Sequence, residues 1–589
     1  MFHGHLWCHV RQKTNGKVIT LRNVEIYNCY ETWIAHCAGS EQTELKMLDE
    51  FQIEDSFFRE LAFGTGGLRG KLGLGPNRLN VYTVGKATQG LADYLNGTFE
   101  NPTVALCRDT RHGSEEFVRR VAEVLAGNGI SSYLFERVEP TPALSFAVRE
   151  LDCSAGVNIT ASHNPAAYNG YKVYGADGCQ ITVEAAEAIQ AAIDPVDCFD
   201  GVKAMPFEKA LENGLVQWVP ERVLDRYLEE TLKVSTGEDC SALRIVYTPL
   251  HGVGLECVSR VLEGIGVAEV ATVDEQCVRD GNFPTCPYPN PEVREALELG
   301  LDYCDRVRPD LLLATDPDTD RVGIAVPHAG EYKLLTGNEV GLLLLDFLAG
   351  KVSEDGRDMF REVACTTIVS APMADDIACA RGIELRRTLT GFKFIGEQVG
   401  VLEREGREAD FLMGFEESYG YLAGTSVRDK DAVVSSMLIC ELAAHWKKQG
   451  LDLYEAMERL YETYGFWSSA LLGQVYEGPE GASDMAAMMS GLRTDGPDAL
   501  GGIAVAERVD YFDGAPMPVV NATDEPQRLP EADVFELRLV DGSRVLFRPS
   551  GTEPKAKAYV FAKGSDRAES EEKLAALVSD AKSILEGNR

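Results

Sequence analysis

One arrangement of residues occurs three times in this chain of 589 residues. In each copy a short apolar run leads into a polar loop and an amphipathic helix, and a glycine precedes a second apolar run. The copies begin at Thr103, Leu243 and Val363, with helices predicted at Ser114–Ala126, Leu255–Glu263 and Met373–Ala380. Strand–helix–strand units of this length are typical of parallel strands joined by a crossover helix. The sequence therefore predicts three domains of related α/β fold, which bind ligands beyond the carboxyl ends of their strands.

The last part of the chain follows a different pattern. Ala504–Tyr511 and Val534–Leu539 alternate apolar and polar side chains, a turn at Asp541–Gly542 leads into a third short run, and an amphipathic helix is predicted over 566–586. Such alternation is typical of antiparallel strands with one solvated face. We therefore expect a fourth domain of α+β type.

The predicted fold class is thus α/β, with three related domains built on mixed or parallel sheets and a C-terminal α+β domain. Residues 1–28 are rich in His and show no clear period, so we expect them to be a leader, and a helical pattern begins at Tyr30. The expected domains are 29–235, 236–350, 351–470 and 471–589.

The charge of the chain limits its partners. A formal net charge of −36 predicts a surface that repels nucleic acid and anionic membranes, so that any phosphate site must be a local basic pocket. The fifteen Cys show no paired zinc spacing, and Met1–His9 has no apolar signal segment, which together indicate reduced thiols in a cytoplasmic protein. The longest apolar run, Val340–Leu348, is too short to cross a bilayer.

The most specific chemical pattern follows a predicted buried strand at Leu311–Thr315. Asp316, Asp318 and Asp320 alternate on a short loop, and three carboxylates this close need a cation. All-oxygen ligands suit Mg²⁺ or Ca²⁺. An EF-hand is excluded, because Arg321 and Pro327 stand where that loop requires Gly and Glu. Three carboxylates leave room for a phosphate oxygen as a further ligand.

A second pattern places a hydroxyl, an imidazole and an amine on one tightly turned loop. Ser162, His163 and Lys172 lie around an Asn-Pro and an Asn-Gly turn. A Ser in such a loop is most often a turn residue. The three-carboxylate loop favours chemistry instead, because a phosphoryl group on Ser162 could complete the metal site.

Three further loops are compatible either with ligand binding or with ordinary turns. Four Gly in Gly64–Gly70 surround Arg69, Gly414–Gly420 carries carboxylates and a hydroxyl suited to sugar hydroxyls, and Phe547–Lys555 combines an Arg with hydroxyls and Gly amides as an anion nest.

Five of these segments occur in an order that resembles the α-D-phosphohexomutase superfamily, in its phosphoglucomutase/phosphopentomutase branch. They are GTGGLRG (Gly64–Gly70), TASHNPAAYNGYK (Thr160–Lys172), DPDTDR (Asp316–Arg321), GFEESYG (Gly414–Gly420) and RPSGTEP (Arg548–Pro554). The resemblance covers roughly residues 30–589 and implies four domains round a central cleft. It also implies a phosphoserine at Ser162 and Mg²⁺ held by that phosphate and the three Asp.

Other roles follow from the same resemblance. His163, Lys172 and Arg69 match catalytic positions, with Lys172 expected as the main proton-transfer group and His163 second. The expected substrate-binding residues are Arg321, Thr390, Gly391, Glu416, Ser418, Lys430, Arg548, Ser550, Gly551 and Thr552.

The expected activity is a mutase that moves a phosphoryl group between the 1- and 6-hydroxyls of glucose, with Mg²⁺ as cofactor and glucose 1,6-bisphosphate as activator. The alternatives are a phosphopentomutase, a phosphomannomutase and a glucose 1,6-bisphosphate synthase. A non-catalytic sugar-phosphate sensor is disfavoured, because Ser162, His163, Lys172 and the three Asp are all present. The partner is a small phosphosugar, and the oligomeric state is left open.

Overall fold

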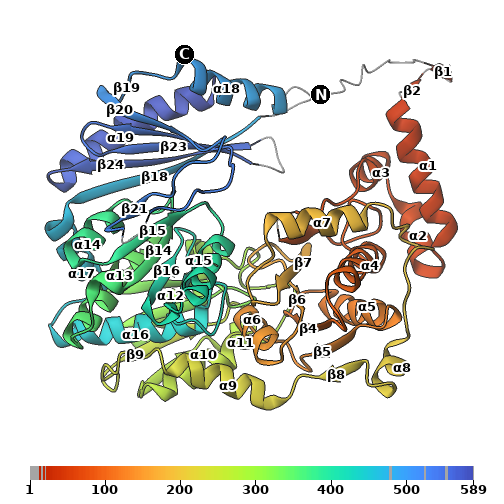
Figure 1. The fold of residues 1–589 in the computed structure, drawn as a ribbon, viewed down its shortest axis with the longest axis horizontal. Helices are drawn as coiled ribbons and strands as arrows, with labels where there is room; N and C mark the ends of the chain where they lie inside the picture. Colours follow the sequence, from red (N-terminus) through yellow and green to blue (C-terminus); the bar gives the residue numbers. More distant parts are fainter. Residues whose placement is uncertain are drawn as a thin grey trace.

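The computed structural model describes residues 12–14, 17–19, 21–64, 66–476, 481–522, 525–550 and 555–587. Apart from a small ribbon of β1 (Gln12–Thr14) and β2 (Lys17–Ile19), the described strands form four sheets, two of five strands and two of six (Figure 1).

The first three sheets repeat one strand order. In each, a central strand pairs in parallel with the next strand on one side and with a third strand on the other, and a fourth strand runs antiparallel to the third. These four strands are β4 (Thr103–Arg108), β5 (Ser131–Leu134), β6 (Ala155–Ile159) and β7 (Tyr168–Gly175) in the first unit; β9 (Arg244–Thr248), β10 (Glu269–Thr272), β11 (Leu311–Thr315) and β12 (Val322–His328) in the second; and β14 (Val363–Thr367), β15 (Glu384–Thr388), β16 (Phe411–Phe415) and β17 (Tyr421–Leu422) in the third. The prediction of three related α/β domains is confirmed.

The crossover helices lie where the sequence predicts them. They are α5 (Ser114–Gly127), α10 (Leu255–Gly264) and α14 (Met373–Arg381). Each turns toward the next strand through a glycine of positive φ, namely Gly129 (75°), Gly266 (78°) and Gly382 (75°). Only glycine adopts this left-handed conformation without a steric penalty, which explains why glycine closes every copy of the repeat.

Additional strands extend these sheets at their edges. The first sheet gains β3 (Gly67–Lys71), antiparallel to β7, and β8 (Val216–Trp218); the second gains β13 (Glu331–Leu335). The third gains β21 (Val519–Val520), which comes from the C-terminal part of the chain and pairs with β15.

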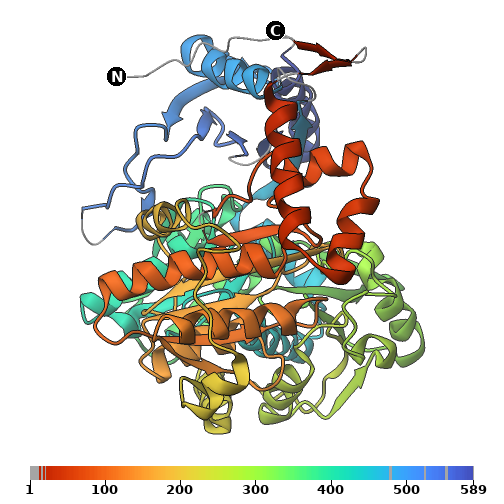
Figure 2. The same ribbon diagram turned by 90° about the vertical axis from the view of Figure 1, so that its right-hand side faces the viewer.

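Three expected boundaries fall inside elements: two inside helices, and the one at residue 470 inside the strand β18 (Phe466–Val475). The one at residue 350 lies within α13 (Gly337–Glu354), whose apolar run Val340–Leu348 is buried in the core and forms one continuous element. The one at residue 28 lies within α1 (Leu21–His36). The helices α1, α2 (Gly39–Met47) and α3 (Glu50–Phe57) form the predicted helical start of the first unit and group beside it (Figure 2).

The C-terminal domain is built on an antiparallel sheet, as predicted. Its strands in spatial order are β18 (Phe466–Val475), β24 (Lys555–Gly564), β23 (Arg544–Pro549), β22 (Phe535–Leu539), β20 (Ile503–Asp510) and β19 (Ala499–Leu500). The helices α18 (Gly481–Asp495) and α19 (Arg567–Leu585) pack on one face. The other face packs against the third unit through Tyr559 and Phe561, so that the blue domain in Figure 1 stands directly above that unit.

Candidate active site

Three loops of different composition occupy the same place in the three repeated units. Each connects the third and fourth strands: β6 to β7 for the Ser162 loop, β11 to β12 for the Asp loop, and β16 to β17 for the Glu416 loop. Each holds one non-glycine residue with positive φ, Ser162 (51°), Thr319 (57°) or Tyr419 (64°). Val322 N donates to Tyr419 O at 3.1 Å, so the second and third loops are joined directly.

Ser162 is buried against the Asp loop. Its Oγ donates to Asp316 Oδ2 at 2.8 Å and lies 3.1 Å from His163 Nδ1, and its amide donates to Thr160 Oγ1 at 2.9 Å. The structure therefore brings together the hydroxyl and the carboxylate that the sequence pairs from loops 154 residues apart.

The three aspartates form a buried group with oxygen atoms all within 4.8 Å of one another. Burial raises the pKa of Asp316 well above its usual range, and the like charges of Asp320 and Asp318 add to this effect. Within the described part of the chain, Asp318 Oδ1 and Asp320 Oδ1 accept no hydrogen bond. Orphaned carboxylate oxygens at the same centre fit a divalent cation with hard oxygen ligands, so this group could hold a metal.

Two lysines offset part of this negative charge. Lys172 Nζ donates to Asp318 Oδ2 at 2.8 Å and to Asp320 Oδ2 at 3.1 Å, and Lys430 Nζ lies 3.4 Å from the same Asp320 oxygen. Burial acts to raise the pKa of Asp320, but Lys172, Lys430 and Arg321 together hold that pKa below its usual range. Lys172 thus contacts the carboxylates, whereas the imidazole of His163 lies within hydrogen-bond distance of Ser162 Oγ, at 3.1 Å.

His163 is kept uncharged by its surroundings. Burial, followed by the neighbouring charges of Arg321 and Arg69, lowers the pKa of His163 to about 2. Arg69 donates to Asn164 Oδ1 at 3.3 Å, and Arg321 donates to Glu292 Oε1 at 2.6 Å. The charges of both guanidinium groups act on His163, so they lie close enough to the serine loop to attract an anionic substrate.

The expected sugar loop is assembled from the third unit. Glu416 Oε1 accepts a hydrogen bond from Gly391 N at 2.9 Å, and Ser418 is half-buried beside it. Burial raises the pKa of Glu416 to about 7, with Lys430 acting against this effect and Glu417 adding to it. Thr390 Oγ1 is buried and has no hydrogen-bond partner among the described residues. Acceptors and a free hydroxyl at one place suit the hydroxyl groups of a sugar.

The predicted anion loop lies on the C-terminal domain. Arg548, one residue before the end of β23, pairs in register with Lys557 on β24, a basic residue that the sequence patterns did not single out. Burial lowers the pKa of Lys557, and the nearby charge of Arg548 lowers it further. Ser550 N donates to Lys555 O at 2.7 Å, whereas Gly551 and Thr552 lie outside the described residues. Two cations on adjacent strands form a basic patch suited to a phosphate.

Sequence patterns also missed three residues that support the site. Thr141 Oγ1 donates to Asp318 Oδ2 at 2.9 Å, and Asp429, next to Lys430, accepts from Tyr174 Oη at 2.9 Å. Arg111 donates to the backbone of the Ser162 loop. No local pattern marks Thr141, but Arg111 and Asp429 belong to charged strand-end loops where ligands are expected.

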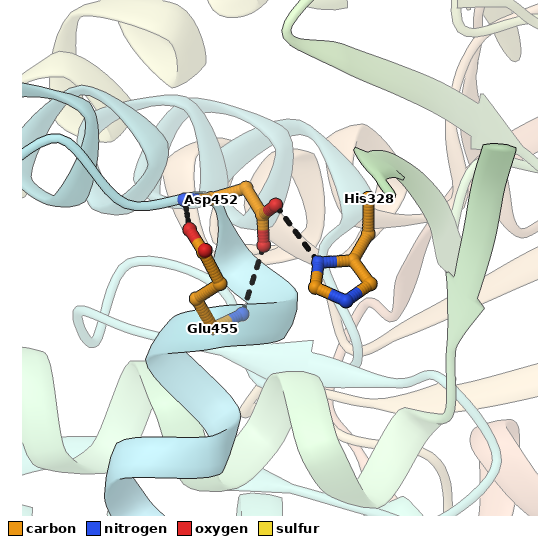
Figure 3. A group of neighbouring side chains, drawn as sticks. All are labelled: His328, Asp452 and Glu455. Atoms are coloured by element: carbon orange, nitrogen blue, oxygen red, sulfur yellow. Dashed lines mark hydrogen bonds and ion pairs between the residues drawn. The ribbon is translucent and has the colours of Figure 1, made fainter. Parts of the chain in front are cut away.

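A second group of possible metal ligands, His328, Asp452 and Glu455, lies at the start of α17 (Leu453–Tyr464) (Figure 3). Asp452 Oδ1 accepts from Glu455 N at 2.8 Å and Glu455 Oε2 accepts from Asp452 N at 3.0 Å, which is a capping box. His328 Nδ1 lies 3.1 Å from the remaining Asp452 oxygen. These contacts account for the group as a helix cap that also anchors the end of β12.

Comparison with known proteins gives the class to which this fold and site belong. Models of the α/β/α domains I, II and III of phosphoglucomutase/phosphomannomutase match residues 60–197, 225–330 and 336–464. The three repeated units and their loops are thus those of a phosphohexomutase.

The sequence relatives identify the family. A phosphoglucomutase of Staphylococcus aureus (strain bovine RF122 / ET3-1) is 37% identical over 86% of this chain and 91% of its own length. A phosphoglucomutase of Staphylococcus haemolyticus is 36% identical over the same shares of the two chains. The chain belongs to the phosphoglucomutase/phosphomannomutase family, within the α-D-phosphohexomutase superfamily, and is an enzyme.

Solved structures share the fold at lower identity. The open form of parafusin, a phosphoglucomutase from Paramecium, has a TM-score of 0.65 and 18% identity, and covers 90% of this chain and 95% of its own. A phosphoglucomutase/phosphomannomutase family protein from Burkholderia thailandensis has a TM-score of 0.63 and 17% identity, with 89% and 97% covered. No helix in the described ranges is both long and apolar enough to span a membrane.

Proposed function

We propose that this enzyme converts glucose 1-phosphate and glucose 6-phosphate into one another through a phosphorylated Ser162 and a glucose bisphosphate. The observation that carries the proposal is the contact of Ser162 Oγ with the buried carboxylate group, 2.8 Å from Asp316, while a separate basic pair, Arg548 and Lys557, lies on another domain. A mutase needs both a transfer site and a second phosphate pocket, whereas a simple phosphatase needs only one. The curated phosphoglucomutase relatives support glucose as the sugar.

In the proposed reaction the phosphoryl group leaves Ser162 and joins the free hydroxyl of the sugar phosphate. The bond from phosphorus to Ser162 Oγ breaks, a bond from phosphorus to the sugar oxygen forms, and a proton passes in balance from the sugar hydroxyl to Ser162 Oγ. We propose Lys172 for this proton transfer, with His163 as the second candidate. The bisphosphate then turns over, and its other phosphoryl group returns to Ser162.

The remaining residues bind and orient. Asp316, Asp318, Asp320 and the phosphate on Ser162 would hold Mg²⁺, which would withdraw charge from the phosphoryl oxygens and make Ser162 a better leaving group. The proposed substrate contacts are Arg69, Arg321, Thr390, Gly391, Glu416, Ser418 and Lys430 for the sugar and the transferred phosphate, and Arg548, Ser550, Gly551 and Thr552 for the other phosphate. Glucose 1,6-bisphosphate, which phosphorylates Ser162 directly, is the proposed activator.

The proposed setting is the cytoplasm, since all the cysteines in the described segments are free thiols and the small phosphosugar is an intracellular type of substrate.

The test is an assay that couples formation of glucose 6-phosphate to a dehydrogenase, run beside the same assay with ribose 1-phosphate. We expect a clear preference for glucose 1-phosphate and a phosphate on Ser162 by mass spectrometry. Ser162→Ala should abolish turnover, whereas Ser132→Ala should not, because the buried Ser132 hydroxyl has no partner in the described structure. Full activity in Ser162→Ala would overturn the mechanism, and a preference for ribose 1-phosphate would overturn the substrate.

A further inference from the structure

Arg111 makes an unusual number of contacts with the loop that carries Ser162. Its side chain is fully buried, and Nη2 donates to Ser162 O and to Asn164 O. Its Nη1 donates to Pro165 O at 3.0 Å and to Tyr168 O at 3.1 Å. One guanidinium group therefore binds four carbonyl oxygens between Ser162 and the first residue of β7, Tyr168.

The orientation of this guanidinium is fixed from two sides. Asp109 Oδ2 lies 3.2 Å from Arg111 Nε, and the Asp109 carboxylate is itself held by Ser114 Oγ at 2.9 Å. On the other side, the Arg111 guanidinium lies 4.9 Å from the ring centre of Phe283, which belongs to the second unit. Arg111 is thus placed by its own unit and by the unit that carries the Asp loop.

The serine loop needs such a restraint. Ser162 has a φ of 51°, a conformation that costs a non-glycine residue about 1 kcal/mol or more. Its relaxation would turn the Ser162 side chain away from Asp316. The N–H groups of Arg111 compensate for this cost, because they donate hydrogen bonds to the four loop carbonyl oxygens. These oxygens point to one place as long as the loop keeps its strained conformation.

We propose that Arg111 is a positioning residue for phosphoryl transfer. It holds the Ser162 loop in its strained conformation and so keeps Ser162 Oγ within hydrogen-bond distance of Asp316. This inference rests on the proposed function at Ser162 and adds a residue to it. A planar fork is required, since four carbonyl oxygens in different directions cannot be bound by the single ammonium of a lysine.

Arg108 offers a matched control three residues earlier. It also donates to three backbone carbonyls, those of Phe135, Glu136 and Arg137, and pairs with Glu115, but in the described structure none of its side-chain hydrogen bonds or ion pairs reaches the serine loop. Arg108→Lys and Arg111→Lys therefore make the same chemical change at neighbouring sites, and only one of them releases Ser162.

The experiment compares wild-type enzyme, Arg111→Lys and Arg108→Lys in three measurements. We expect kcat of Arg111→Lys to fall about 100-fold, the loss typical of a reacting group misplaced by about 1 Å. KM for glucose 1-phosphate should stay within threefold of the wild-type value, because the substitution leaves the basic pair Arg548 and Lys557 unchanged. Hydrogen exchange should accelerate over 162–168 alone. Arg108→Lys should match wild-type enzyme in kcat, in KM and in hydrogen exchange over 162–168.

The inference is overturned if folded Arg111→Lys keeps kcat within threefold of Arg108→Lys, or if its hydrogen exchange rises throughout the first unit rather than in the serine loop. If Arg111→Lys does not fold, Asp109→Asn serves instead. It weakens the partner of Arg111 Nε, and we expect a fall in kcat of about tenfold at constant KM; an unchanged kcat would again overturn it. Wild-type enzyme inactive on glucose phosphates would refute the proposed function, while the exchange measurement would still report on Arg111.

Discussion

Glu416 is expected to stabilise the folded enzyme less than a glutamine would, although the proposed function depends on its charge. Its carboxylate is buried and accepts one hydrogen bond from Gly391 N. Burial raises the pKa of Glu416 to about 7 from an ordinary value of 4.5. Glu416→Gln removes the ionisation and keeps a carbonyl oxygen that can accept from the same amide.

The size of the effect follows from the pKa. Because the folded-state pKa lies above the unfolded value, the protonated carboxyl stabilises the fold below pH 4.5, and this contribution is lost as the pH rises through about 7. A change from 4.5 to about 7 corresponds to about 3 kcal/mol. Glu416→Gln should therefore resemble wild-type enzyme in stability at pH 5 and exceed it by up to about 3 kcal/mol at pH 8.

Thermal denaturation at the two pH values measures this difference, with the exposed Glu405→Gln as control. The same substitution should lower kcat/KM about 10- to 100-fold, the range for loss of a charge-assisted hydrogen bond to a sugar hydroxyl. This prediction is refuted if Glu416→Gln is no more stable than wild-type enzyme at pH 8, or if its gain in stability is equally large at pH 5. Either result would show that burying the ionised Glu416 carboxylate does not cost stability.

Three further substitutions test separate parts of the molecule. Asp318→Asn should reduce Mg²⁺ affinity at least tenfold by calorimetry while the fold persists, since Thr141 can still donate to the amide oxygen; unchanged affinity would exclude Asp318 as a ligand. Arg548→Gln should raise KM for glucose 1-phosphate about 10- to 100-fold. The phosphorylated fraction of Ser162, measured by mass spectrometry, should stay unchanged. A loss of that phosphate would place Arg548 at the transfer site instead. Trp33→Ala should lower the free energy of unfolding of the N-terminal helices by about 3–5 kcal/mol, because this ring packs on three aromatic rings. We therefore expect α1 to become sensitive to protease while kcat stays unchanged. Resistance of α1 to protease would contradict the packing argument.

Local patterns were sufficient for the elements and for the loop of the three aspartates. Apolar runs, helical periods and closing glycines are properties of neighbouring residues, so β4, α5 and their counterparts could be predicted closely. The three alternating carboxylates identified their loop because like charges need a cation whatever the fold.

Non-local features could not be predicted in the same way. That β21 pairs with β15, or that Lys557 comes to lie beside Arg548, depends on how distant segments pack. Arg108 ends β4 and Arg111 follows three residues later, yet of these two side chains only Arg111 donates to the serine loop in the described structure. Side chains that bind backbone carbonyls leave no periodic pattern, so their targets appear only in three dimensions.

The repeated fold explains why interfaces between units are as important here as the loops themselves. The three aspartates come from one loop and can assemble within a single unit, but Ser162 meets them only if the first and second units are correctly docked. Three of the contacts between these units lie outside the carboxylate group itself: Thr141 N to Asp318 O at 2.9 Å, Thr110 Oγ1 to His251 O at 3.1 Å, and the Arg111–Phe283 stack. Two of them come from the strand-end loop that also holds the serine turn. A shift of one unit against the other therefore changes the distance from Ser162 to Asp316 directly, and the transfer step should be the first property lost when this interface is weakened.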